Sequence, residues 1–220
     1  MHLLEMKQLW VEQMELAGVP LSSGLEVFSD LVGRYNQKRR YYHNLNHIAH
    51  LLKLWQENKT ALQDPLAVFL AIWFHDAVYR PGSLSNEQKS AELVKKLFAH
   101  TTMSGCLIDK VQTLVMATRL HYGEDRDSQI FIDFDLAILG EPSSVYRRYV
   151  FGVFKESSMP NAIFAPLRRR WLLKMLDRPR LFNAMPGQEI YEVGARENLK
   201  MELHRGGSYG DYGIPENARA

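Results

Sequence analysis

The chain has 220 residues and a formal charge of +2, from 27 basic and 25 acidic side chains, and 46% of its residues are hydrophobic. This balance is typical of a globular protein and gives no reason to expect a nucleic acid as partner. The single cysteine, Cys106, excludes an internal disulfide and a cysteine-based zinc cluster and fits a reducing compartment. No segment approaches the roughly 18 apolar residues of a membrane span, and the start does not resemble a signal peptide. We therefore expect a cytoplasmic protein.

Apolar residues at helical spacing predict three helices in the first part of the chain. The first runs from Leu3 to Ala17, and the second from Leu25 to Tyr35, where Ser22 or Ser23 can act as the N-cap. A third runs from about Asn44 to Glu57, with its apolar residues on one face. Each of these helices is therefore expected to turn one side to a core.

The stretch from Leu66 to Tyr79 is apolar nearly throughout and predicts a buried helix. It opens with nine apolar residues in a row, after which His75 and Asp76 stand side by side. Asp64-Pro65 just before it is a strong helix start. Burying an ionisable pair is costly unless the two groups are hydrogen-bonded, paired or bound to a metal. The sequence therefore predicts a site at the end of this helix.

The second half of the chain continues the helical pattern, without alternating runs that would indicate strands. Asp127 or Ser128 is the expected N-cap of its third helix. The predicted helices cover 86–100, 107–121, 129–140, 145–157, 164–176 and 190–204. An all-α, single-domain protein is the natural interpretation.

Two stretches near the C-terminus carry further expectations. Three consecutive arginines, Arg168 to Arg170, are expected to form a solvated helix face rather than a nucleic-acid patch. The glycine-rich end is too poor in apolar residues to pack by itself. Tyr209, Tyr212 and Ile214 are its sizeable side chains, and we expect them to dock onto the helical body or onto a second subunit.

Ionisable residues recur on or beside the apolar helices and suggest a metal centre. Histidine nitrogens combined with carboxylate oxygens suit Zn, Fe, Mn or Ni, and Mg stays open, although a pure oxygen set would suit it better. The residues concerned are His43, His47, His75, Asp76, Asp133 and Asp135.

The order of these residues resembles the HD superfamily of metal-dependent phosphohydrolases. The phrases YHNLNHI, FHDAVY, NEQKSA, DFDLAILG and AREN are similar to one branch, usually described only as predicted HD phosphohydrolases. The resemblance implies an HD-type helical bundle with its metal-site core over about 39–140. A C-terminal helical extension over about 143–204 and an irregular tail over 205–220 would complete the domain.

Carried over residue by residue, the resemblance assigns the metal ligands. They are His47, His75, Asp76 and Asp135, and Asp76 would also assist removal of a proton from the attacking water. Asp135 is preferred to Asp133 because DFDLAILG resembles the run of the family in which the second aspartate binds metal. Leu136 stands where many relatives carry arginine, so no role of that arginine can be transferred.

Three residues near the expected ligands keep two or more interpretations. His43 can contact a ligand or the substrate, bind a second ion or cap a helix. His121 can face phosphate or stabilise the C-terminal end of a helix. Glu87 can act as a general base for the attacking water or place a negative charge in the first turn of its helix.

A further group is expected to support the ligands or to contact the substrate. Arg40 can bind phosphate or be solvated, and Arg119 is a second candidate for holding phosphate. Asp133 is expected to orient a ligand rather than to bind the metal.

The implied activity is hydrolysis of a small phosphate ester or anhydride, with a nucleotide as the expected substrate and one divalent transition metal ion as cofactor. The alternative is a metal-stabilised binding or regulatory module without turnover. Oxygen-dependent chemistry at two irons is a weaker third interpretation, because His100 and His121 are the only histidines between the doublet and Asp135. A homodimer is compatible with the sequence, and nothing indicates a membrane partner.

Overall fold

The computed structural model describes residues 1–206 and 208–212, and over this part of the chain it contains helices and no strands, so the expected all-α class is confirmed. Ile214, one of the three expected anchors, lies outside the described residues. The α-helices are α1 (Leu3–Leu16), α2 (Leu21–Tyr35), α3 (Leu45–Asn58), α4 (Pro65–Phe74), α5 (Asn86–Phe98), α6 (Gly105–Ala117), α7 (Arg126–Leu136), α8 (Ser143–Ser157), α9 (Asn161–Leu176) and α10 (Gln188–Arg205). The 3-10 helices are η1 (Lys59–Ala61), η2 (Ala137–Gly140) and η3 (Tyr209–Asp211).

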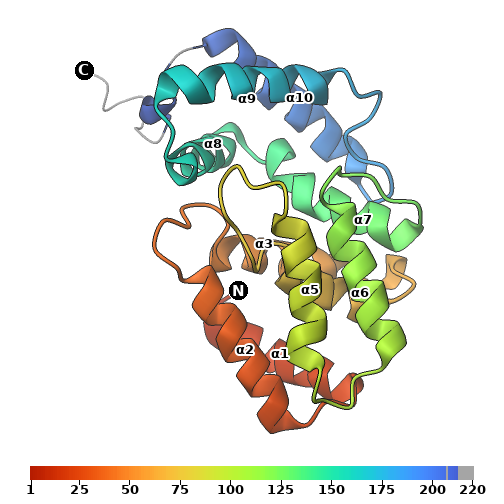
Figure 1. Cartoon of the computed structure of the whole chain (residues 1–220). Coiled ribbons are helices and arrows are strands. Elements are labelled where there is room, and N and C mark those ends of the chain that lie inside the picture. The colour runs from red at the N-terminus through yellow and green to blue at the C-terminus, as the bar shows by residue number, and fades with distance from the viewer. Residues whose placement is uncertain (207, 213–220) are drawn as a thin grey trace.

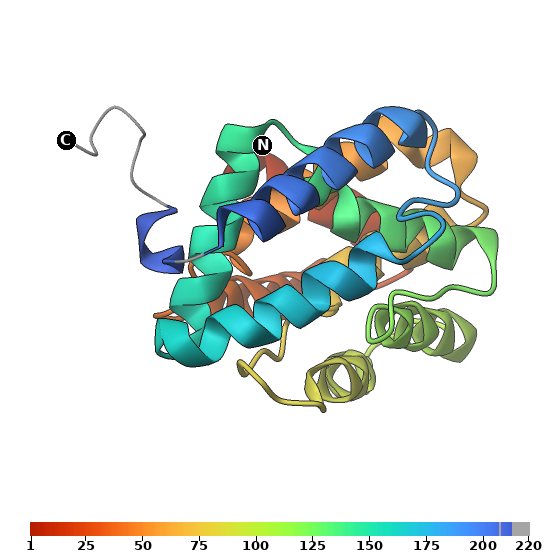
Figure 2. The same cartoon turned by 90° about the horizontal axis from the view of Figure 1, so that it is seen from above.

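The helices form a larger body built from α1 to α7 and a layer built from α8 to α10 (Figure 1). Helix α4 packs against α1, α3, α5, α6 and α7, and every residue from Ala67 to Phe74 is buried. Seen from above, α9 and α10 lie side by side across the body (Figure 2). The apolar run of α4 is therefore the centre of the larger body.

Two predicted helix starts are confirmed by their caps. The Asp64 side chain accepts a hydrogen bond from the amide of Ala67 at 3.0 Å, with proline in the first turn of α4. Asn44 caps α3 in the same way by accepting from the amide of Asn46 at 2.8 Å. Both caps fix where the two central helices begin, and hence where their histidines lie.

Other predicted boundaries are wrong. Helix α2 begins directly after Pro20, so Ser22 and Ser23 lie inside it. Helix α6 ends at Ala117, and the expected continuation to His121 is a turn.

The start of α7 also differs from the prediction, because Asp125 is its N-cap. The expected cap Asp127 is buried instead and accepts hydrogen bonds from the amides of Gln63 and Asp64 at 2.7 and 2.9 Å. Its carboxylate thereby ties the start of α7 to the start of α4.

The upper layer is attached to the body where two glycines meet. A Cβ atom on Gly140, at the end of η2, would lie 2.6 Å from the carbonyl oxygen of Tyr191 in α10. A Cβ on Gly194 would lie 2.7 Å from the carbonyl oxygen of Gly140. Only glycine allows backbones to approach this closely, so η2 and α10 pack with no side chain between them.

A buried polar network holds the upper layer together and corrects one expectation. Arg168 is not on a solvated face: its guanidinium donates to Glu202 at 2.9 and 3.1 Å. It also donates to the hydroxyl of Tyr149 at 3.1 Å and to that of Tyr146 at 3.4 Å. The periodic pattern fails here because the partners of the buried arginine come from two other helices, α8 and α10, which its own helix cannot indicate.

Two of the expected anchors dock onto this layer. Tyr209 is 4% exposed, with its ring edge-on to Phe164 at 4.9 Å, and it stacks on Tyr212 at 5.2 Å. The groove that receives them belongs to the helical body of the same chain.

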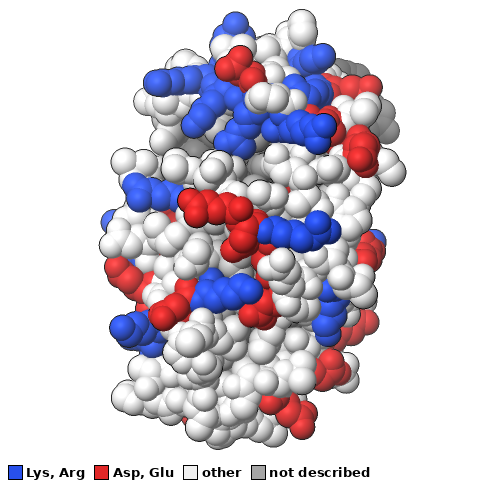
Figure 3. All heavy atoms as spheres, turned by 90° about the vertical axis from the view of Figure 1, so that its right-hand side faces the viewer, with Lys and Arg blue, Asp and Glu red and all other residues white. Residues whose placement is uncertain are grey.

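The surface carries charges of both signs. Lysine and arginine side chains gather at the upper end of the face in Figure 3, over the layer of α8 to α10, whereas acidic and basic residues mix in the middle. Among the described residues no helix has the length and apolar character that spanning a membrane requires.

Candidate metal centre

His75 follows the last residue of α4 and is held in one orientation. Its Nδ1 lies 2.9 Å from the carbonyl oxygen of Ile72, one turn earlier. A carbonyl can only accept, so Nδ1 carries the proton and Nε2 of the neutral ring presents a lone pair. This backbone contact is the usual way in which a protein orients a histidine that binds a metal.

His47 meets His75 head to head. It comes from the first turns of α3, and the two Nε2 atoms are 3.1 Å apart. Nδ1 of His47 is buried without a hydrogen-bond partner among the described residues. If both Nε2 atoms are bare, their lone pairs repel, so a proton or a cation is needed between them.

The two aspartates add oxygens to this pair of nitrogens. Asp135 Oδ1 lies 3.4 Å from Nε2 of His47 and 3.6 Å from Nε2 of His75. Asp76 Oδ2 lies 3.2 Å from Nε2 of His75 and 4.0 Å from that of His47. All four side chains therefore converge on one small region at the ends of three helices.

These distances fit the edges of a metal coordination shell. Two ligands that are each about 2.1 Å from one ion lie about 3.0 Å apart at a right angle and about 3.4 Å apart at the tetrahedral angle. His47, His75 and Asp135 form a mutually close set that could hold a metal ion. His47 and His75 are 4% and 2% exposed, whereas the Asp76 and Asp135 side chains keep 17% and 16%, so the cluster is open on its carboxylate side.

The charges of the cluster depend on one another. Burial opposes a charge on His75, but Asp76 and Asp135 beside it raise the pKa of His75 well above the ordinary value. Burial lowers the pKa of His47. Despite burial, the hydrogen bonds from His121, His47 and His75 hold the pKa of Asp135 well below its usual range. A cation in the cluster would take the place of the proton that the carboxylates attract.

His121 reaches the cluster from a strained turn. Its Nε2 lies 3.4 Å from Asp135 Oδ2, the oxygen that does not face His47. Its backbone has φ +47°, in the left-handed region where a side chain other than that of glycine is rare. Such strain persists where the surroundings impose it and is common at functional sites. His121 thus lies on the turn after α6 and contacts the Asp135 carboxylate, and a contact with phosphate stays a prediction.

His43 lies on the other side of Asp76 and is fixed by a residue that the sequence analysis missed. Its Nδ1 is 2.5 Å from Glu156 Oε2, and its Nε2 is 3.8 Å from Asp76 Oδ2. The ring lies against Tyr79, with centroids 4.3 Å apart. A usable signal existed, because Glu156 continues the buried stripe of α8 through Tyr146, Tyr149 and Gly152.

Asp133 does not have the role expected of it. Its carboxylate accepts hydrogen bonds from the amides of Asn183, Ala184 and Met185 at 2.7 to 3.0 Å. The two aspartates are two residues apart on α7 and point to different sides, so only Asp135 lies in the cluster. Asp133 thus fastens the loop before α10 and contacts none of the four clustered side chains.

Arg40 supports the doublet through its backbone. Its guanidinium donates to the carbonyl oxygens of His43, Asp76 and Ala77 at 3.1, 2.7 and 3.1 Å. It also lies over the rings of Tyr35 and Tyr79. Because these donors are engaged, Arg40 is better suited to holding the doublet in place than to binding phosphate.

The remaining predicted residues are not brought to the cluster. Arg119 is exposed on the turn before His121, and Glu87 is half-buried in the first turn of α5. Among the described residues, neither side chain forms a hydrogen bond or ion pair with the four ligands. Their roles as phosphate contact and general base stay predictions.

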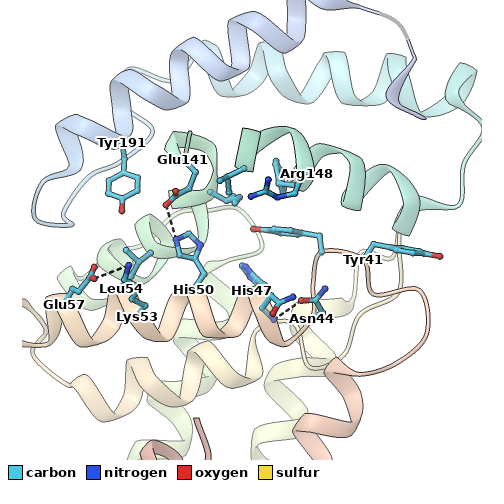
Figure 4. Close-up of a pocket in the computed structure, with 15 residues that line it drawn as sticks. Tyr41, Asn44, His47, His50, Lys53, Leu54, Glu57, Glu141, Arg148 and Tyr191 are labelled. Atoms are coloured by element: carbon cyan, nitrogen blue, oxygen red, sulfur yellow. Dashed lines mark hydrogen bonds and ion pairs between the residues drawn. The ribbon is translucent and has the colours of Figure 1, made fainter. Parts of the chain in front are cut away.

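A separate cavity of about 460 Å³ lies between α3 and the upper layer (Figure 4). His50, Lys53 and Glu57 line it from α3, whereas Arg148 and Tyr191 face it from above. Of the four clustered residues only His47 belongs to its wall. The cavity therefore borders the cluster at His47 and does not include the two carboxylates.

No family model matches this chain, and neither a curated protein nor a solved structure matches it.

Proposed function

We propose that the chain is a metal-dependent phosphohydrolase of the HD type. The observation that carries the proposal is the head-to-head contact of His47 and His75, whose Nε2 atoms face each other with two carboxylates beside them. The resemblance of the sequence motifs to HD phosphohydrolases supports the same conclusion. The proposed substrate is a small phosphate ester or anhydride, with nucleotides first among the candidates.

His47, His75, Asp76 and Asp135 would hold one divalent ion, for which Mn, Fe, Ni or Zn suit the mixed nitrogen and oxygen donors. A bound ion of this kind lowers the pKa of a coordinated water and neutralises charge on a phosphoryl group. Asp76, on the side that faces His43, would accept the proton from the attacking water. Asp135 is kept ionised by its three histidine partners, and the carbonyl of Ile72 orients His75.

The proposal is tested by metal analysis followed by a phosphatase screen over nucleotides and other small phosphates. The purified protein should contain close to one divalent ion per chain and should release phosphate from at least one substrate. His75→Ala and Asp76→Ala should remove the metal and the activity while circular dichroism stays helical.

A matched control comes from the same helix. His50 lies one turn after His47 on α3 and pairs with Glu141 at 3.3 Å, outside the cluster. His47→Ala should lose the metal, whereas His50→Ala should retain it. Full metal retention in both His75→Ala and Asp76→Ala would refute coordination at this site, and a loaded but inactive protein would favour a binding module without turnover.

A further inference from the structure

Glu156 is an unusual residue for its place in the fold. It is 1% exposed and stands at the penultimate position of α8, where the helix dipole disfavours a negative charge. In the described part of the chain, no lysine or arginine forms a hydrogen bond or ion pair with its side chain. A buried carboxylate in such a position is expensive unless it is well hydrogen-bonded, so its partners indicate what it is for.

The carboxylate of Glu156 faces the segment that leads to His47, and Tyr79 is a further partner. Oε1 accepts from the amides of Tyr42 and His43, both at 2.8 Å, and Oε2 contacts Nδ1 of His43 at 2.5 Å. A carboxylate can only accept hydrogen bonds, so Nδ1 of His43 must be the nitrogen that carries the proton. Glu156 thus fixes both the position of this histidine and its tautomer.

The opposite nitrogen of His43 faces the open side of the cluster. Nε2 is 3.8 Å from Asp76 Oδ2, which is too long for a direct hydrogen bond and is the kind of separation that a bridging water spans. A water that donates one hydrogen to Asp76 and the other to Nε2 has its lone pairs directed away from both acceptors. Two fixed acceptors therefore define the orientation of one water beside the ligands.

We propose that Glu156 is a positioning residue that holds His43 as the Nδ1–H tautomer, so that Nε2 accepts a hydrogen bond from the attacking water. This inference rests on the proposed hydrolytic function. It assigns a role in the reaction to a residue of α8, outside the core over 39–140 that carries the four ligands. His43 would accept the hydrogen bond of the water at Nε2, and Glu156 would influence the reaction only through its contact with His43.

Glu156→Gln tests the proposal with little change of shape. The amide oxygen of glutamine can still accept from the amides of Tyr42 and His43, but its NH₂ group now faces Nδ1 of His43. The ring must then accept at Nδ1 and carry its proton on Nε2, so it can no longer accept from the water. We expect kcat to fall roughly 10- to 100-fold, as for other partners of metal ligands, with KM and metal content unchanged.

The tautomer is read directly by ¹⁵N NMR of the histidine rings, with His43 assigned by its loss in His43→Gln. Despite burial, the carboxylates of Asp76 and Glu156 raise the pKa of His43. The spectra of the metal-free and the Zn²⁺-loaded protein are therefore recorded above that pKa, where the ring is neutral. Wild type should show His43 protonated at Nδ1 and bare at Nε2, and Glu156→Gln should show the reverse. Because this reading needs no turnover, absence of phosphatase activity would refute the proposed function without deciding the tautomer.

Glu192→Gln is a matched control elsewhere in the upper layer. Glu192 Oε2 likewise accepts from two successive amides, those of Leu181 and Phe182, and its other oxygen contacts Arg196 instead of a histidine. Glu192→Gln should leave kcat and the His43 spectrum unchanged, which separates the tautomer from the general loss of a clamping carboxylate.

A double-mutant cycle completes the test. If Glu156 acts only through His43, the variant carrying both His43→Gln and Glu156→Gln should lose no more activity than His43→Gln alone. Wild-type protein with a proton on Nε2 of His43, wild-type kcat in Glu156→Gln, or additive losses in the cycle would each overturn the proposal.

Discussion

The chain contains two buried polar clusters, one around Arg168 in the upper layer and one between His47 and His75, and their hydrogen bonding differs. Each nitrogen of the Arg168 guanidinium donates to an acceptor, and these acceptors are Glu202, Tyr146 and Tyr149. Between His47 and His75, two imidazole nitrogens of the same kind face each other at 3.1 Å beside carboxylate oxygens. The first cluster is complete in itself, whereas the second has more acceptors than the chain has donors.

This difference distinguishes a structural network from a site. A buried network that satisfies all its members holds one arrangement of helices together. A buried group of acceptors that converge on one point carries an excess of negative charge, which a bound cation relieves. The two clusters should therefore respond in opposite ways to substitution, one through stability and the other through metal content.

The largest expected effect is at Asp135. Asp135→Asn removes the carboxylate charge that contacts three histidines, and we expect it to abolish stoichiometric metal binding. Isothermal titration with Zn²⁺ or Mn²⁺ measures the loss. Asp133→Asn is the control two residues away: it should keep the metal and cost about 1–3 kcal/mol of stability, because three backbone amides lose a charged acceptor. A larger loss of metal at Asp133 would contradict our assignment of the two aspartates.

The second effect is at Arg168 and should appear in stability alone. Arg168→Met leaves Glu202 buried without its cation, and we expect a loss of about 3–5 kcal/mol in the free energy of unfolding. Replacing both partners, by Arg168→Met together with Glu202→Leu, should recover much of this loss, because no unpaired charge remains. Urea denaturation measures both variants. Metal content at the His47–His75 cluster should not change in either, and a change would mean that the two clusters are coupled.

The smallest effect is the pH dependence of metal affinity. His75 has a pKa well above its ordinary value in the metal-free cluster, so below that pKa the ring holds a proton that a cation must displace. Affinity should rise with pH by about tenfold per unit, and level off once His75 is neutral. Zn²⁺ titrations in buffers of several pH values test this slope. A pH-independent affinity would mean that His75 is not among the ligands.

The sequence was informative where the chemistry is local. The approximate start of α3, the cap at Asp64, the buried run of α4 and the order of His47, His75 and Asp135 could all be predicted along the chain. It failed where a residue depends on partners far away. Arg168 was taken for a surface residue because its helix contains nothing that neutralises it, and Glu156 was missed because His43 lies 113 positions earlier.

Contacts between distant residues also cross the expected boundary between the core over 39–140 and the C-terminal extension. The ligands lie within the core over 39–140, but Glu156 orients His43 from α8 and Asp133 holds the loop before α10. The extension is therefore in direct contact with the residues around the cluster, and its close packing through Gly140 and Gly194 fixes that contact.

Two requirements conflict at His121: its backbone is left-handed, which favours glycine, and its side chain contacts Asp135. A glycine at that position would relax the left-handed conformation, which costs other residues roughly 1–2 kcal/mol. The same change would deprive Asp135 of one of its three histidine partners. The stability of the fold and the contact with Asp135 thus favour different residues at this position. The His121 side chain therefore comes at a cost in the free energy of folding.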